Sequence, residues 1–326
     1  MDPKHEQPNS VPTIFIPTGV NQGGICPPGT IAEALGHLHH SGIVVLANVV
    51  DVAHVDALNA ILTPQAAILG AQPGQHFNFG AHTGNINQAP PVTESLMFSD
   101  VWANPIVLSI LSAVLGPAPV LHYACGNTVL PAPAPALAVG RQPVHSDIEF
   151  PHPGFPFSFV VNVPLIDLTT ANGATEVWLG SHAATSFYDQ ILVQDQDVAP
   201  GLPVRAIIPA LVERRRAISP PVRAVAPRGS IVIRDLRLWH AGLPNLTSTP
   251  RIMLAFVWQA AWWRGRGLVR LPLAARATVE SWERSVVPFR IATKWLDGPV
   301  DYLATSSLPV DTSLASSDPA LLEAFS

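Results

Sequence analysis

Three side chains that could bind a metal follow one another at alternate positions in "RQPVHSDIEF", residues 141–150. These are His145, Asp147 and Glu149. Successive side chains of a β-strand point to opposite faces, so all three would share one face if the stretch is extended. An imidazole beside a carboxylate is a common ligand pair for a transition metal. The stretch therefore predicts a metal centre, and its two carboxylates leave open which of them is the ligand.

A second histidine and an arginine further along the chain extend this prediction. A site of two histidines and one carboxylate binds Fe(II) and leaves coordination positions open for other ligands. His240, in "GSIVIRDLRLWHAG" (residues 229–242), is the candidate for the other imidazole, on a later strand that faces His145 across a barrel. Arg251 opens the next predicted strand, and an arginine can hold a carboxylate with two charge-assisted hydrogen bonds. The His-x-Asp pattern alone is weak evidence for an iron site. Together with the distant His240 and with Arg251 it is considerably stronger.

With these residues the chain resembles the phytanoyl-CoA dioxygenase family of Fe(II)/2-oxoglutarate-dependent oxygenases. The resemblance spans about residues 31–261 and is carried by "QPVHSD", "NGATEVWLGSH", "GSIVIRDLRLWHAG" and Arg251. Leu179 stands where the family usually has proline. The chain looks most similar to members from fungal natural-product pathways, which carry similar "GNINQ" and "RDLRLWHAG" stretches.

The resemblance assigns the central residues of an active site. It implies that His145, Asp147 and His240 bind Fe(II), and it thereby favours Asp147 over Glu149 as the carboxylate ligand. It implies that Arg251 pairs with the distal carboxylate of 2-oxoglutarate. For Glu149 two interpretations remain, a rim residue that hydrogen-bonds nearby backbone and a contact to a polar group of the substrate.

The resemblance also suggests polar contacts around the co-substrate. Gln142 is expected to hydrogen-bond 2-oxoglutarate, and the "GNINQ" loop offers Asn85, Asn87 and Gln88 as further candidates, with Asn85 also a candidate for the substrate. Some members place a hydroxyl residue two positions after the second histidine. That position is Gly242 here, so we expect the contact to be absent or to come from elsewhere, with Thr128 as the candidate.

The implied activity is the oxidation of a small, largely apolar secondary metabolite. Fe(II), 2-oxoglutarate and O2 are the implied cofactor and co-substrates, with release of succinate and CO2. Hydroxylation, desaturation and oxidative rearrangement all remain open. Two other classes are weighed against this one: a catalytically inactive jelly-roll protein that binds a ligand, and a cupin-type metal enzyme that does not need 2-oxoglutarate.

The elements that must position these residues form an all-β core with flanking helices, and the resemblance implies a double-stranded β-helix, the jelly-roll or cupin-like fold. Apolar periodicity and turn residues predict helices at 30–40, 52–69 and 99–115, a buried strand at 43–50 and a loop at 77–91. Short β-prone runs separated by turns then indicate an antiparallel sandwich or barrel. These runs lie at 119–130, 156–166, 174–179, 229–236 and 251–262. A helix is expected at 276–295.

We expect one dioxygenase domain over residues 1–326. Its predicted parts are an irregular arm at 1–29, a mainly helical flank at 30–116, a jelly-roll core at 117–262 and a C-terminal helix and tail at 263–326. An insertion at 183–228 should be partly helical. The stretch "PAPAPALAV", residues 131–139, predicts a surface spacer or a lid.

Composition excludes several classes of protein. Hydrophobic residues make up 48% of the 326 residues and charged residues 13%, which predicts a sizeable core. The net charge of −5 argues against nucleic acid as a partner. The two cysteines are far apart, which favours reduced thiols over a disulfide framework. Without an apolar leader or an uninterrupted apolar run of membrane-spanning length, we expect a cytoplasmic protein that needs no membrane. The family resemblance is compatible with a homodimer.

Overall fold

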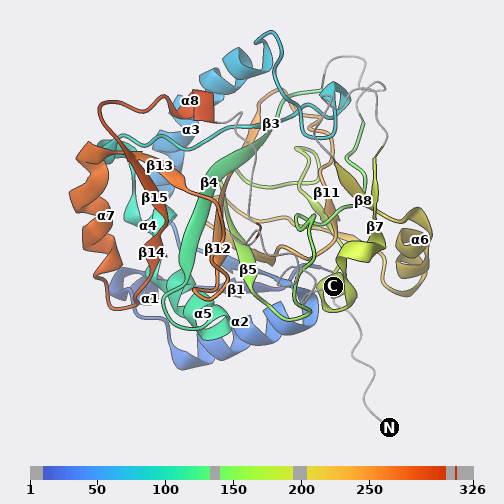
Figure 1. Cartoon of the computed structure of the whole chain (residues 1–326), viewed down its shortest axis with the longest axis horizontal. Coiled ribbons are helices and arrows are strands. Elements are labelled where there is room, and N and C mark those ends of the chain that lie inside the picture. The colour runs from blue at the N-terminus through green and yellow to red at the C-terminus, as the bar shows by residue number, and fades with distance from the viewer. Residues whose placement is uncertain (1–9, 133–139, 194–203, 306–312, 314–326) are drawn as a thin grey trace.

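The computed structural model describes residues 10–132, 140–193, 204–305 and 313 (Figure 1). A long main sheet runs through the middle of the molecule, in the order β1-β2-β10-β5-β12-β4-β14, with β3 also paired to β4. Its strands are β1 (Thr13–Phe15), β2 (Ile43–Ala47), β3 (Asn85–Asn87), β4 (Val120–Val129), β5 (Ser158–Pro164), β10 (Ile231–Asp235), β12 (Arg251–Gln259) and β14 (Arg290–Ile291). The central pairs β2–β10, β10–β5, β5–β12 and β12–β4 are all antiparallel, as the alternating runs predicted.

Smaller sheets complete the β-structure. The three-stranded sheet has the order β11-β6-β9 and holds the second histidine. Its strands are β6 (Glu176–Val177), β9 (Val222–Arg223) and β11 (His240–Ala241). The two-stranded sheets pair β7 (Gln190–Leu192) with β8 (Arg205–Ile207), and β13 (Val269–Pro272) with β15 (Thr293–Leu296).

Helices flank this β-core, which agrees with the expected architecture. They are α1 (Thr18–Gly23), α2 (Pro28–Ser41), α3 (Val52–Gly70), α4 (Ser99–Trp102), α5 (Pro105–Leu115), α6 (Pro209–Ile218), α7 (Arg276–Glu283) and α8 (Tyr302–Thr305). The helix predicted at 30–40 is α2, which ends where Gly42 adopts a left-handed conformation with φ of 76°. The helix predicted at 52–69 is α3, and the strand predicted at 43–50 contains β2.

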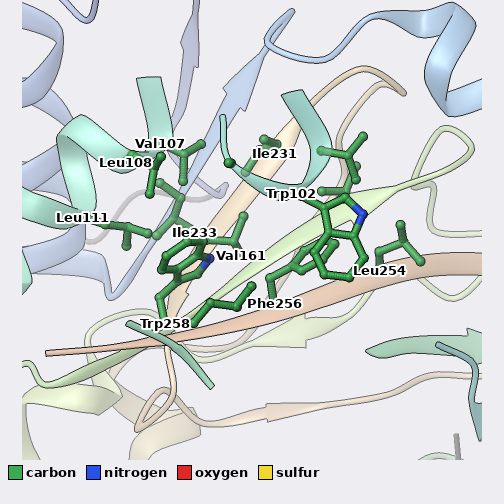
Figure 2. Close-up of a cluster of buried hydrophobic side chains, with 14 of the residues drawn as sticks. Trp102, Val107, Leu108, Leu111, Val161, Ile231, Ile233, Leu254, Phe256 and Trp258 are labelled. Carbon is green, nitrogen blue, oxygen red and sulfur yellow. The ribbon is translucent and has the colours of Figure 1, made fainter. Parts of the chain in front are cut away.

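The two faces of the main sheet have different roles. On β12, Leu254, Phe256 and Trp258 face the helices and pack in one large apolar cluster. Figure 2 shows these side chains meeting Trp102 of α4 and Val107, Leu108 and Leu111 of α5. Side chains alternate along a strand, so Arg251, Met253 and Ala255 lie on the opposite face. We call this opposite side the inner face, because it faces away from the helices.

Four sequence predictions need correction. The predicted helix 99–115 is two helices, because Asn104 caps α5 and the residue before Pro105 avoids helical geometry. The predicted helix 276–295 ends at Glu283, because Pro288 cannot continue a helix, and β14 and β15 follow. The arm 1–29 contains β1, which pairs with β2, and α1, and the predicted loop 77–91 contains β3. The proline-rich stretch 133–139 lies outside the described residues.

Helix α3 is long and apolar enough to cross a membrane by length and composition alone. Its residues Val55, Leu58 and Leu62 are instead buried in the large apolar cluster beneath the main sheet. A helix packed against a sheet in this way passes the same test as a membrane span. These buried residues form the face of α3 that packs in the core.

Candidate metal centre

The ligand atoms of His145, Asp147 and His240 lie within 4.8 Å of one another. Oδ1 of Asp147 is 3.4 Å from Nε2 of His240 and 4.0 Å from Nε2 of His145. An isolated antiparallel bridge brings the two histidines together, because their backbones exchange two hydrogen bonds of 2.9 Å. The stretch around His145 is thus not a regular strand, and this single bridge aligns it with β11.

Both imidazoles are oriented by backbone carbonyl groups. Nδ1 of His145 lies 2.9 Å from the carbonyl oxygen of Pro143, and Nδ1 of His240 lies 3.1 Å from that of Leu238. A carbonyl can only accept a hydrogen bond, so these contacts favour the tautomer with the proton on Nδ1. In that tautomer the lone pair of Nε2 points toward Asp147 and is free to bind a metal.

The charges in this group suit a divalent cation. Burial, together with the nearby His240, lowers the pKa of His145 to about 3, so this imidazole is neutral. Burial by itself raises the pKa of Asp147, but the charges of Arg234 and His240 outweigh that effect and hold it well below the usual value. A neutral imidazole and an ionised carboxylate are the protonation states in which these groups bind metals.

Arg251 is almost completely buried and has no acidic partner among the described residues. Its side chain is held by neutral oxygens: Nη1 lies 3.3 Å from the carbonyl of Asn127, and Nη2 lies 3.4 Å from the carbonyl of Gly173. Nε has no hydrogen-bond partner in the part of the chain that the structure describes. Burial, with a smaller effect of the charge of Arg223, lowers the pKa of Arg251 to about 10, so the group remains protonated at neutral pH. A buried guanidinium without a counter-ion fits a ligand that brings a carboxylate.

A chain of asparagine amides leads to Arg251. Asn85 and Asn127 exchange hydrogen bonds of 3.0 and 2.9 Å between their side chains, and Oδ1 of Asn127 is 3.5 Å from Nη1 of Arg251. Asn78 donates to Oδ1 of both Asn85 and Asn87. The "GNINQ" segment therefore reaches the guanidinium through Asn85, while Asn87 is linked to Asn85 through Asn78.

Gln142 packs against Gly242. Some family members have a hydroxyl residue at the position of Gly242. Its Oε1 accepts a hydrogen bond of 2.8 Å from the backbone nitrogen of Gly242. A Cβ atom on Gly242 would lie only 2.5 Å from that Oε1 and 3.3 Å from Nδ2 of Asn85. Gln142 and Asn85 therefore fill the space that a side chain at this position would need. We call Arg251, Asn127, Asn85 and Gln142 the polar cluster.

Other predicted residues lie elsewhere. Thr128 faces the helices, because its neighbour Asn127 faces inward, and its buried hydroxyl donates to Oε1 of Gln88 at 2.8 Å. The structure therefore brings neither Thr128 nor Gln88 to the polar cluster. Glu149 is exposed and is not part of the metal-ligand group; its Oε1 accepts a hydrogen bond from the backbone nitrogen of Arg205 at 3.2 Å.

The structure adds two residues that the sequence did not reveal. Asn127 joins the asparagine chain to Arg251. Arg234, on the inner face of β10, donates from Nη2 to Oδ2 of Asp147 at 2.6 Å. The alternation of apolar residues along β10 could have flagged Arg234, because a charged residue stands there at an inward-facing, buried position.

Comparison with known proteins identifies the family. The family model described as "Phytanoyl-CoA dioxygenase (PhyH)" matches residues 38–253, well over half of the chain. The chain belongs to the phytanoyl-CoA dioxygenase family. Among solved structures, it is similar to the non-heme alpha ketoglutarate dependent epimerase SnoN from nogalamycin biosynthesis, with 17% sequence identity and a TM-score of 0.49. That match covers 72% of this chain and 85% of the other.

Membership of the phytanoyl-CoA dioxygenase family confirms the predicted class. The sheet-rich core with flanking helices is the jelly roll of this family, and the protein is an Fe(II)/2-oxoglutarate-dependent oxidoreductase that uses O2. This class favours the oxygenase over the two other classes considered from the sequence, the inactive binding protein and the metal enzyme independent of 2-oxoglutarate. The donor set of His145, Asp147 and His240 fits Fe(II), and the unpaired Arg251 fits the co-substrate.

Proposed function

We propose that this oxygenase holds Fe(II) through Nε2 of His145, Oδ1 of Asp147 and Nε2 of His240, and that Arg251 binds the distal carboxylate of 2-oxoglutarate. The observation that carries the proposal is the pairing of two features. Three ligand atoms converge within 4.8 Å, and a buried guanidinium without an acidic partner lies on the inner face of the same sheet that carries Arg234. Two histidines and one carboxylate leave positions open on Fe(II) for further ligands.

In this proposal each polar residue has a defined task. Arg251 fixes one end of 2-oxoglutarate, and Asn127 fixes Arg251. The amide oxygen of Gln142 accepts a hydrogen bond from the Gly242 nitrogen. Its amide nitrogen is the group that donates to the co-substrate. Fe(II), when bound together with 2-oxoglutarate and O2, supplies oxidation of the substrate with release of succinate and CO2. The protein binds, orients and keeps water away.

The surroundings of Asp147 support a largely apolar substrate. Its backbone nitrogen donates to the carbonyl of Leu236 at 3.0 Å, and Leu236 belongs to an apolar cluster. The cluster contains Ile148, Phe157, Val160, Leu236, Val257 and Trp263, with the half-buried Tyr123, Phe150 and Ala255 packed against it. We infer that a small organic secondary metabolite binds here and undergoes hydroxylation, desaturation or oxidative rearrangement within a single catalytic domain.

Succinate release against a panel of apolar natural products tests this proposal. The wild-type protein should form succinate only with Fe(II) and 2-oxoglutarate, and one or more panel members should increase the rate. His145→Ala and Asp147→Ala should abolish both Fe(II) binding and turnover. The matched control is His37→Ala, a partly exposed histidine of α2 outside the metal-ligand group, which should behave like the wild type. Unimpaired turnover in either ligand variant would contradict the assignment.

A further inference from the structure

The side chain of Arg234 contacts two of the proposed metal ligands, Asp147 and His240. Arg234 is on β10, opposite Ile43 of β2 and Val160 of β5, and is 8% exposed. Its neighbours Ile231 and Ile233 pack in the large apolar cluster on the helix side. The guanidinium is thus placed on the inner face by the same alternation that places Arg251 there.

The two oxygens of Asp147 are in different surroundings. Oδ2 accepts a hydrogen bond of 2.6 Å from Nη2 of Arg234. Oδ1 is the oxygen that faces Nε2 of His145 and His240. A charge-assisted hydrogen bond of this length is strong, and it restricts rotation of the carboxylate. The side chain of Asp147 is one-third exposed, and the bond to Arg234 holds its Oδ2 away from the side on which Oδ1 faces the two histidines.

The contact of Arg234 with His240 has a second consequence. Nη1 of Arg234 lies 3.3 Å from Nδ1 of His240, which is also 3.1 Å from the carbonyl oxygen of Leu238. When Nε2 binds a metal, Nδ1 carries the proton and donates to Leu238, so it cannot accept from Arg234. Of His240 and Asp147, only Asp147 can then accept a hydrogen bond from the guanidinium of Arg234.

We propose that Arg234 is a positioning residue that holds Asp147 as a one-oxygen ligand, with Oδ1 toward the metal and Oδ2 withheld. This inference rests on the proposed function, because it assumes a metal at the three-residue group. One carboxylate oxygen and two imidazoles occupy three positions, so the remaining positions stay free for the co-substrate and O2. If both oxygens bound, one of those positions would be lost.

Cobalt(II) is a suitable probe, because its visible absorption reports on the number and arrangement of its ligands. Arg234→Met removes the hydrogen bond and the charge, whereas Arg234→Lys keeps a charged donor on a slightly shorter side chain. Arg228→Met is the matched control, since Arg228 pairs with Asp56 in an exposed ion pair away from the metal ligands. Thermal unfolding of each metal-free variant establishes that it is folded.

We expect Arg234→Met to weaken Co(II) binding about 10-fold or more in calorimetric titration, as the loss of groups that orient metal ligands does. Its Co(II) spectrum should differ from that of the wild type, Arg234→Lys should recover part of the change, and Arg228→Met should match the wild type. If folded Arg234→Met keeps the wild-type spectrum and affinity within twofold, or binds Co(II) more tightly, the positioning role is wrong. Failure of the wild-type protein to bind Co(II) would instead contradict the metal centre itself.

Discussion

At the scale of single residues, Arg251 carries a sharp prediction about the co-substrate. Arg251→Met should raise the KM for 2-oxoglutarate on the order of 100-fold or more, because truncating one partner of a buried charged hydrogen bond costs about 2–5 kcal/mol. In thermal unfolding with Mn(II) present, 2-oxoglutarate should raise the Tm of the wild type and not that of the variant. Arg251→Lys keeps the charge but cannot donate two parallel hydrogen bonds to one carboxylate, so its KM should lie between those of the wild type and Arg251→Met. An unchanged KM would remove Arg251 from the co-substrate site.

A substitution of Glu149 tests whether this second carboxylate is a metal ligand. Glu149→Gln keeps an oxygen that can accept the hydrogen bond from the Arg205 backbone, so the local loop should be preserved. We expect Fe(II) affinity within twofold of the wild type, measured by titration under anaerobic conditions. A loss of Fe(II) binding would place Glu149 among the ligands, and a change of substrate affinity alone would favour its contact with the substrate.

Residue types and spacing made His145 and His240 candidate ligands, and the family resemblance favoured Asp147 over Glu149 as the carboxylate. They were not enough for Asn127 and Arg234, because each acts through a contact between segments that are distant in the sequence. Thr128 is the opposite case, a residue that was predicted at the site and lies elsewhere. Its type suits a co-substrate contact, but the register of β4 with β12 turns it toward the helices, and register is a property of the folded sheet.

At the scale of elements, the cap of α5 links a sequence feature to stability. Oδ1 of Asn104 accepts from the backbone nitrogens of Ile106 and Val107, and its Nδ2 donates to the carbonyl of Val49 at 2.8 Å. Asn104→Ala should lower the free energy of unfolding by about 2–3 kcal/mol, because it removes a helix cap and leaves a buried carbonyl without a partner. Urea denaturation measures the change.

The exposed cap of α3 supplies the comparison for that prediction. Asp51 accepts from the backbone nitrogen of Ala53 at 2.9 Å and is exposed to solvent. Asp51→Ala should therefore cost only about 1 kcal/mol, since water can replace the lost hydrogen bond. Equal costs for the two variants would show that burial of Asn104 adds nothing to its cap.

Long periodic elements could be predicted from the sequence, and short ones could not. Helices α2 and α3 carry their own capping and turn residues, so their limits are local properties. Strands β14 and β15 have only two and four residues, and their partners β4 and β13 lie earlier in the chain. Nothing local distinguishes them from the end of a helix except Pro288, which is why the helix predicted at 276–295 was too long.

At the scale of the whole molecule, the inner face of the main sheet is divided by polarity. The polar cluster around Arg251 lies at the beginning of β12, and the apolar cluster with Val257 lies toward its end. The metal-ligand group touches the apolar cluster through Leu236. Under the proposed function, this division presents a charged co-substrate and an apolar substrate to the same metal from one sheet, and the helix side provides the stabilising core.

The burial of both cysteines makes their thiols reporters of unfolding. Burial raises the pKa of Cys26 from 9.0 to about 11 and also raises that of Cys125, so at pH 8 the folded protein holds few reactive thiolates. Because the folded-state pKa is the higher one, the contribution of these thiols to stability is intact below pH 9 and is lost as the pH rises toward 11.

At pH 8, labelling of either thiol should be at least about 100-fold slower in the native protein than in urea, because both low thiolate content and steric exclusion slow it. Mass spectrometry of the labelled peptides separates the two sites, and rapid labelling of one cysteine in native buffer would show that its surroundings open without global unfolding.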